Sequence, residues 1–231
     1  MRTSAQTPPS GAPDGRATRW EGHKAERRDL IIASAIEAIS ERGGDVAVGE
    51  IAERAGIPRS VIYRIFTDRE DLDENIRTRI VEDLMADLAP ALAPQGTVRD
   101  AIDQAVETYL RWIITFPRLH RFLGTGSASR PTTGSRVVTG TKTAIAVQVT
   151  ELIAAALRAA DSDPAIAETL AFGMVGLVDG SVNRWVASEE RSVSSETLGT
   201  FLAEAIWQLL RHTAETGGIT IAPDTLLSDL L

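Results

Sequence analysis

Two short helical patterns joined by a glycine turn occupy residues 51–66, which read IAERAGIPRSVIYRIF. Gly56 suits the tight turn, because glycine adopts the positive backbone angles that such turns require. Pro58 suits the start of the second helix, where a backbone N–H needs no partner. The arrangement predicts a helix-turn-helix, a unit whose second helix enters the major groove of duplex DNA.

The second of these helices carries the groups expected to contact DNA. Arginine can donate two hydrogen bonds to guanine, and valine can contact a thymine methyl group. We predict DNA contacts from Arg59, Ser60, Val61, Tyr63, Arg64 and Arg69. Spacing alone also admits a second interpretation, in which Tyr63 and Phe66 are core aromatics of a helical hairpin and the arginines are solvated.

The remaining sequence also follows the helical period, with apolar residues three and four positions apart and no convincing strand or repeat. We therefore predict an all-α protein, with an N-terminal three-helix head that contains the helix-turn-helix and a C-terminal helical body. The expected parts are a disordered arm at 1–22, a DNA-binding domain at 23–70, a ligand-binding and dimerisation domain at 71–217 and a tail at 218–231.

The net charge of −8 is carried mainly by the predicted body. Residues 1–80 hold 13 basic and 14 acidic side chains, a net of −1, whereas residues 81–231 hold 11 and 18, a net of −7. Because binding depends on the local arrangement of charge, an acidic total does not exclude DNA as a partner.

Enzyme chemistry and metal binding have little support in the composition. Cysteine is absent, and the three histidines, His23, His120 and His212, lie far apart in the sequence. No phosphate-binding glycine loop and no nucleophile with a matching base is present. We predict that the protein is not an enzyme and needs no metal or cofactor.

Targeting signals are also missing from the sequence. Residues 1–19 lack an apolar run typical of a signal peptide, and no apolar stretch approaches the roughly 18 residues that span a membrane. We predict a cytoplasmic protein without a membrane partner.

The helix-turn-helix region resembles the TetR (tetracycline repressor-like) family over roughly residues 25–75. The shared pattern is Ile51-Ala52, Ala55-Gly56-Ile57, Ile62-Tyr63, Phe66 and Arg69-Glu70-Asp71-Leu72. Several customary polar positions of the family are apolar or absent here: Ala47, Gly49, Pro58, Val61 and Ile65. The departures place more of the expected DNA contact on the arginines, Ser60 and Tyr63.

The resemblance implies a homodimer in which the last two long helices of each subunit form a four-helix bundle. Residues 164–188 suit such a role, since three glycines on one face allow close helix approach. The expected interface residues are Leu170, Gly173, Met174, Leu177, Gly180, Ser181, Trp185, Leu198, Leu202, Ala205 and Leu209. Ordinary packing within one chain is the alternative for the same residues.

The resemblance also implies a pocket for a small molecule between the middle helices. The candidate lining residues are Tyr109, Trp112, Ile113, Phe116, His120, Phe122 and Met174, although aromatic residues at helical spacing also suit a core. Asp179 and Asn183 lie one turn apart in an apolar helix, where they either hydrogen-bond across the dimer or face a ligand.

These features together predict a DNA-binding transcriptional regulator. The leading hypothesis is a homodimeric repressor that is released from a double-stranded DNA operator by a small, mostly apolar effector. The alternative is a DNA-binding regulator that has no small-molecule effector and therefore needs no cavity.

Overall fold

The computed structural model describes residues 15–92, 96–124, 136–188, 190 and 192–230. Within these residues all regular elements are helices, and the β-type pairing is an isolated bridge between Thr97 and Leu226. The α-helices are α1 (Gly15–Arg42), α2 (Val48–Arg54), α3 (Arg59–Ile65), α4 (Arg69–Leu92), α5 (Val98–Thr115), α6 (Pro117–Gly124), α7 (Arg136–Ala159), α8 (Ala167–Ala187) and α9 (Ser195–Thr216). The short 3-10 turns are η1 (Pro164–Ile166) and η2 (Leu227–Asp229). The predicted all-α fold is confirmed.

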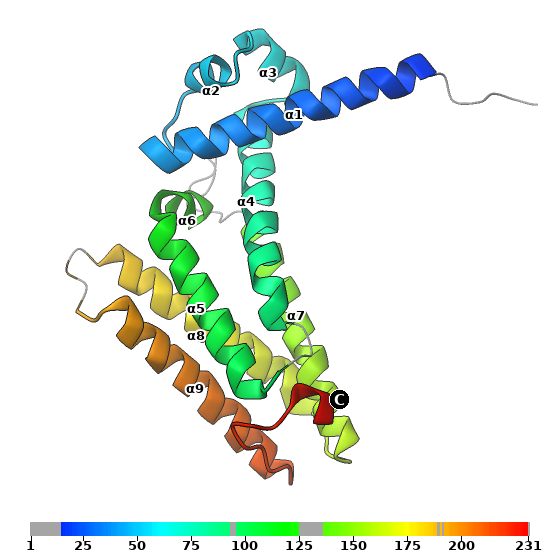
Figure 1. The fold of residues 1–231 in the computed structure, drawn as a ribbon, viewed down its shortest axis with the longest axis vertical. Coiled ribbons are helices and arrows are strands. Elements are labelled where there is room, and N and C mark those ends of the chain that lie inside the picture. Colours follow the sequence, from blue (N-terminus) through cyan, green and yellow to red (C-terminus); the bar gives the residue numbers. More distant parts are fainter. Residues whose placement is uncertain (1–14, 93–95, 125–135, 189, 191, 231) are drawn as a thin grey trace, which may run out of the picture.

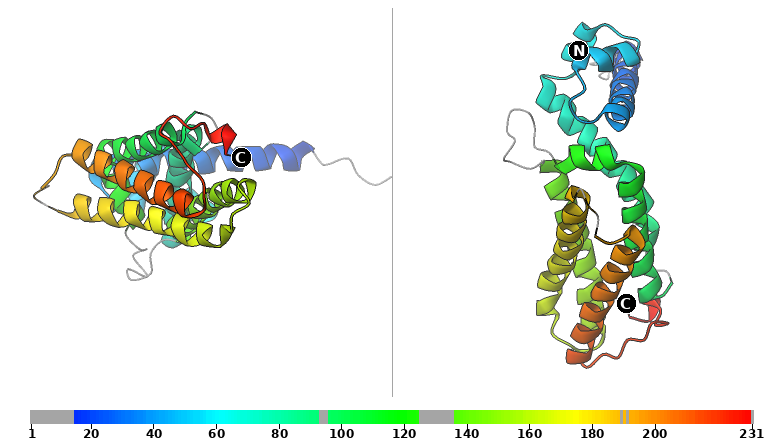
Figure 2. Two further views of the ribbon diagram at one scale, coloured as in Figure 1. Left: turned by 90° about the horizontal axis from the view of Figure 1, so that it is seen from below. Right: turned by 90° about the vertical axis from the view of Figure 1, so that its left-hand side faces the viewer.

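The molecule is a small head on a larger helical body (Figure 1; Figure 2). Helix α1 lies across the head beneath α2 and α3, and α4 runs from the head down into the body. Helices α5, α7, α8 and α9 form the body, and the short α6 lies between this bundle and α1. Helix α4 crosses the expected domain boundary at residue 70, so head and body share one structural element.

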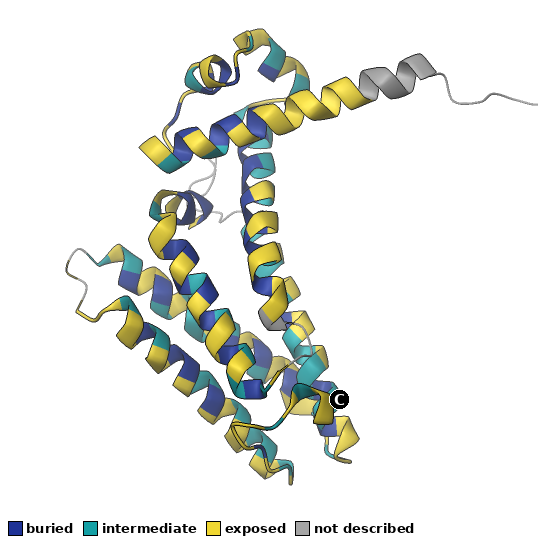
Figure 3. Cartoon of the chain, viewed as in Figure 1, coloured by how far each residue is buried: buried dark blue, intermediate teal, exposed yellow. Residues whose placement is uncertain are grey.

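An apolar core and a glycine turn fix the arrangement of the three helices in the head. Ile31, Ile51, Ile62 and Phe66 bring α1, α2 and α3 together with almost no exposed surface (Figure 3). Gly56 has a φ of 64°, so the turn uses the left-handed conformation expected from its sequence. This packing fixes the angle between α2 and α3.

Capping residues set the starts of two body helices. The Thr97 hydroxyl accepts from the backbone N–H of Asp100 at 3.0 Å, and the Ser194 hydroxyl accepts from the N–H of Thr197 at 3.1 Å. Such caps satisfy N–H groups that have no partner within the helix. They fix where α5 and α9 begin.

The two ends of the chain differ from the sequence expectation. Helix α1 begins at Gly15, so the predicted disordered arm is wrong for residues 15–22, and residues 1–14 lie outside the described residues. The predicted tail folds back against the start of α5: the N–H of Val98 donates to the Thr225 carbonyl at 3.1 Å, and the N–H of Leu227 to the Gly96 carbonyl at 3.0 Å. Apolar side chains in residues 219–230 provide the reason, because they cover the lower end of the body core.

The expectation that no stretch is long and apolar enough to cross a membrane is wrong. Residues Pro164–Ala187 meet that criterion by length and composition. Only 22% of its apolar stretch is fully buried, and the rest is half-buried or exposed, so the helix keeps a partly uncovered surface. Such a surface also suits a partner subunit, and length and composition alone are weak grounds for a membrane span.

Candidate functional site

Helix α3 divides its side chains between the head core and the solvent. Ile62 is 1% exposed and faces inward, whereas Tyr63 is 45% exposed, and Arg59, Ser60 and Arg64 are exposed as well. Val61 is half-buried. The outer face of α3 therefore presents two guanidinium groups, a hydroxyl and a phenol in one short stretch. Of the two aromatics considered for the core, Phe66 is buried and Tyr63 is not.

Arg59 and Tyr63 contact one another on this outer face. The Arg59 guanidinium donates to the Tyr63 hydroxyl at 3.0 Å and lies 5.3 Å from the centroid of the phenol ring. The pairing limits the rotamers of a long exposed side chain before any ligand binds. A restricted arginine loses less conformational entropy when it forms its next hydrogen bonds.

Ion pairs tie α2, the partner of α3, to α1. The Arg54 guanidinium donates to Glu37 at 3.3 Å and also contacts Glu41. The hydrogen bond to Arg54 lowers the pKa of the Glu41 carboxyl, so the ion pair between Arg54 and Glu41 stays charged near neutral pH. The contacts orient the helix-turn-helix on α1.

Arg69, the sixth predicted DNA contact, uses its guanidinium for hydrogen bonds within the protein. Its Nε donates to Asp73 at 2.7 Å, and its Nη1 donates to the Val46 carbonyl at 2.6 Å. Asp73 is almost fully buried, and burial raises the pKa of its carboxyl, an effect that Arg69 opposes. Arg69 therefore joins the start of α4 to the loop before α2, and we do not include it among the proposed DNA contacts.

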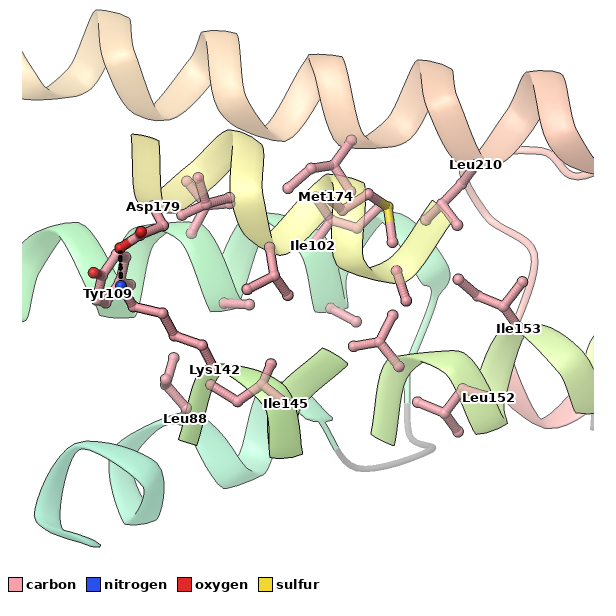
Figure 4. A pocket seen from close by; sticks show the side chains of 18 of the residues that line it. Leu88, Ile102, Tyr109, Lys142, Ile145, Leu152, Ile153, Met174, Asp179 and Leu210 are labelled. Carbon is pink, nitrogen blue, oxygen red and sulfur yellow. Dashed lines mark ion pairs between the residues drawn. The ribbon is translucent and has the colours of Figure 1, made fainter. Parts of the chain in front are cut away.

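The body contains a cavity of about 540 Å³ (Figure 4). Helices α4 to α9 all contribute to its wall, which consists mainly of aliphatic side chains. Four of the predicted lining residues face it: Tyr109, Trp112, His120 and Met174. The volume lies within the roughly 300–1,000 Å³ that is common for small-molecule sites.

Three other predicted lining residues do not face the cavity, so the prediction is wrong for them. Ile113 is 1% exposed and points into the core on another side of α5. Phe116 is the C-cap of α5 and is 37% exposed. Phe122 packs against the Arg77 guanidinium on the face of α6 that meets α4. The spacing of the aromatic residues predicted that these helices line the cavity, but not which face of each helix points into it.

Polar groups gather at one end of the cavity. Lys142 Nζ lies 2.7 Å from Asp179 Oδ1, and the Asn183 amide donates to the same oxygen at 2.8 Å. The Tyr109 hydroxyl and the His120 ring belong to this end too, with the two ring centroids 6.5 Å apart. Burial raises the pKa of Tyr109, with a smaller contribution from Asp179, so the phenol stays protonated. Sequence reasoning missed Lys142, a lone lysine in a helix otherwise free of charge from 137 to 150.

The C-terminal segment contributes to the cavity wall near its other end. Ile219, Ile221, Leu227 and Leu230 line the cavity beside residues of α7 and α9. The hydrogen bonds of this segment to the start of α5 hold it in place. The described part of the segment 218–231, expected only to be a tail, therefore supplies part of the candidate site.

Head and body meet at a buried arginine. Arg77 on α4 is 1% exposed, pairs with Glu74 at 2.9 Å and places its guanidinium 4.6 Å from the centroid of the Phe122 ring. On the other side of α6, Arg118 donates to the Ser40 carbonyl of α1 at 3.2 Å. Residues of both α4 and α6 line the cavity, so helices that touch the cavity also support the head.

Comparison with known proteins identifies the family. A family model described as "Tetracyclin repressor-like, C-terminal domain" matches residues 87–221, more than half of the chain. A second, "Bacterial regulatory proteins, tetR family", matches residues 31–75. The chain belongs to the TetR family. It is therefore a DNA-binding transcriptional regulator, and the TetR signature lies on the helices that form the head.

Individual TetR relatives agree with this assignment. The chain is 28% identical over 207 residues to the HTH-type transcriptional regulator Rv0472c of Mycobacterium tuberculosis, covering 89% of this chain and 86% of that protein. It is 25% identical to the HTH-type transcriptional activator FasR of Mycolicibacterium smegmatis, covering 81% and 84%. A crystal structure of a TetR-family regulator from Streptomyces coelicolor superposes with a TM-score of 0.64 at 24% identity, covering 84% and 86%.

The departures from the TetR pattern have visible consequences at the start of α2. Ala47 occupies the N-cap without a side-chain oxygen, and the Glu50 carboxylate accepts from the Ala47 N–H at 3.1 Å. Arg42 holds that carboxylate from the opposite side at 2.6 Å. The helix is thus capped from within by an acidic group.

Helices α8 and α9 share an uncovered face that only partly matches the predicted interface. On α8 the glycines 173, 176 and 180 are exposed, and a Cβ at any of them would meet nothing within 4 Å. On α9 Phe201 is 55% exposed and Leu209 42% exposed, while Ala205 is half-buried. Ser181, Leu170 and Leu177 are half-buried; Leu170 lines the cavity, and Leu177 packs against the body core.

Four predicted interface residues are buried within the subunit, so their assignment is wrong. Met174 faces the cavity, and Leu202 is fully buried. Leu198 is buried in the same core, and the Trp185 indole donates to the Val193 carbonyl at 2.9 Å. They occupy the inward sides of α8 and α9 rather than the face that carries the exposed glycines and Phe201.

Proposed function

We propose that this regulator is a homodimeric repressor that leaves a double-stranded DNA operator when a small, mostly apolar effector enters the body cavity. The observation that carries the proposal is the apolar cavity, whose wall includes the helices that support the head. The alternative without an effector needs a closed core, and the cavity of about 540 Å³ disfavours it.

The proposed DNA contacts are Arg59, Ser60, Val61, Tyr63 and Arg64. Their support is the outer face of α3, where these groups are exposed or half-buried beside one another. Two subunits are needed to span two half-sites about one helical turn apart. We also propose that the protein acts in the cytoplasm, where a DNA target would lie, without a membrane partner.

The proposed dimer forms through the uncovered faces of α8 and α9. Small side chains allow close helix approach, and Phe201 and Leu209 supply apolar area around the glycines. This assignment also accounts for an apolar helix that is only partly covered within one chain.

Replacing Gly176 by leucine is expected to weaken the dimer. The Cβ meets nothing within 4 Å in the subunit, so the monomer folds, but the added side chain occupies the proposed contact between two α8 helices. Overpacking costs about 1–3 kcal/mol, and it occurs twice in a symmetric dimer, so the dissociation constant rises at least about 30-fold. Sedimentation equilibrium measures this constant.

Gly140→Leu is the matched control for the dimer prediction. Gly140 is an exposed glycine in α7 with equal room for a side chain, and it lies away from the α8 and α9 face. An unchanged dimer constant for Gly176→Leu would place the interface elsewhere.

Filling the cavity is expected to remove the effector response while DNA binding persists. Ala105 lines the cavity from α5, so Ala105→Phe places a ring in the space that the effector needs. We expect at least about a tenfold increase in the effector concentration that releases DNA, with operator affinity unchanged within about twofold. Fluorescence anisotropy of a labelled DNA duplex from the upstream region follows both quantities.

Gln104→Phe is the control for the cavity prediction. Gln104 is exposed on the same helix, so the substitution adds the same ring without entering the cavity. A normal effector response in Ala105→Phe would show that the effector binds elsewhere.

A reporter strain tests whether the protein represses. Deletion of the gene raises transcription from the promoter that carries the operator if the protein represses, and lowers it if the protein activates.

A further inference from the structure

The cavity has one polar end and one apolar end. In Figure 4 Tyr109, Lys142 and Asp179 gather together, whereas Leu152, Ile153 and Leu210 lie at the opposite end. The apolar end also includes Leu227 and Leu230 of the C-terminal segment. A molecule that fills both ends must be amphipathic, with its polar group beside Asp179.

The charges of the polar end cancel. Among the described residues that line the cavity, Lys142 and Asp179 are the only ones with full charges at neutral pH, and they form an ion pair at 2.7 Å. Burial lowers the pKa of His120, although Asp179 opposes this effect, so the imidazole is neutral near pH 7. The site therefore offers no net charge to attract an ionic ligand.

A charged ligand would compete with one partner of this pair for the other. A carboxylate that takes the Lys142 ammonium leaves Asp179 with the Asn183 amide alone, next to an apolar wall. An ammonium ligand leaves Lys142 uncompensated in the same way. Removing one partner of a partly buried ion pair is costly, because the remaining charge keeps its desolvation penalty.

A neutral hydroxyl or carbonyl group can join the pair without breaking it. The Lys142 ammonium has three N–H donors, and the protonated Tyr109 hydroxyl is a further donor near the same point. Within the described part of the chain, both contacts to Asp179 use Oδ1, so Oδ2 remains to accept from a ligand hydroxyl. Donors and an acceptor thus surround the place of the polar group.

We propose that the effector is an uncharged amphiphile, with one hydroxyl or carbonyl group at Lys142 and Asp179 and an aliphatic body that extends toward Leu152 and Leu227. The assignment rests on the proposed function only in treating the cavity as the effector site. It does not depend on whether occupancy releases DNA.

Three ten-carbon probes with different head groups test the assignment on the full-length protein without DNA. Isothermal titration calorimetry at pH 7 compares 1-decanol, decanoate and decylammonium. We expect decanol to bind at least about tenfold more tightly than either ion. Equal or tighter binding of decanoate or decylammonium, or no binding of any probe, overturns the proposal.

Two substitutions make the expectation specific to the ion pair. Asp179→Asn leaves a lone Lys142 charge and is expected to shift preference at least about tenfold toward decanoate. Lys142→Met leaves a lone Asp179 charge and is expected to shift preference toward decylammonium by a similar factor. Asp83→Asn is the matched control, because it removes the carboxylate of the exposed Arg79 pair on α4, outside the cavity.

The outcomes separate this assignment from the proposed function. If both variants change head-group preference as expected but decanol leaves operator affinity unchanged, the cavity chemistry stands and control of DNA binding by the cavity fails. If the two variants keep the wild-type order of affinities while retaining the wild-type melting temperature, the head-group assignment fails. If one variant has a lowered melting temperature, the head-group preference of the other variant decides the outcome.

Discussion

Replacing Arg59 and Arg64 together by alanine is expected to lower operator affinity by roughly 30-fold or more in each half-site. A well-formed arginine contact to guanine contributes about 1–3 kcal/mol, and two such contacts are lost from each α3 helix. Both side chains are exposed, so the variant should fold with a normal melting temperature. Fluorescence anisotropy against operator and scrambled duplexes measures the loss of affinity and of sequence preference.

The matched control removes the same number of arginines from the body. Arg79 forms an exposed ion pair with Asp83, four residues later in α4, and Arg111 forms one with Glu107, four residues earlier in α5. Arg79→Ala with Arg111→Ala changes the net charge equally and is expected to alter operator affinity by less than about threefold. Wild-type sequence preference in the Arg59 and Arg64 variant would contradict the assignment of α3.

Replacing Arg77 by methionine is expected to lower the free energy of unfolding by about 3 kcal/mol. The buried guanidinium pairs with Glu74 and packs on the Phe122 ring, and loss of one partner from a buried pair costs about 3–5 kcal/mol. The Glu74 side chain is 21% exposed, so water can partly solvate it after Arg77 is lost, which favours the lower end of that range. Differential scanning calorimetry should show the melting temperature about 6–12 °C lower.

Arg79→Met, two residues further along α4, is the control for this effect. Its ion pair with Asp83 is exposed on both sides and is expected to contribute less than about 1 kcal/mol. If Arg77→Met lowers the stability no more than Arg79→Met, the buried pair does not hold α4 against α6, and the proposed connection between cavity and head loses its main support.

The sequence was most informative where a pattern is local. The local pattern placed Arg59 and Arg64 on the DNA-facing side of the second helix and Gly56 at the turn, because each depends on neighbouring residues alone. Local spacing also contained a signal that was missed: Asp73 lies four residues after Arg69, the usual distance for an ion pair on one helix.

Long-range packing decided what the sequence did not specify. The rotation of α5 determines that Trp112 faces the cavity and Ile113 does not, and no local pattern fixes that rotation. The ion pair of Lys142 with Asp179 joins α7 to α8 across 37 positions. Residues 219–230 lack a helical period, so their apolar side chains gave little indication that they cover a cavity.

The most direct test of control by the cavity is the affinity of one effector for the free protein and for the protein bound to DNA. Binding linkage requires that the effector weaken DNA binding by the same factor by which DNA weakens effector binding. We expect a factor of at least about tenfold in both directions, with decanol as the first ligand to titrate. Equal effector affinity in the free and DNA-bound protein would contradict the account.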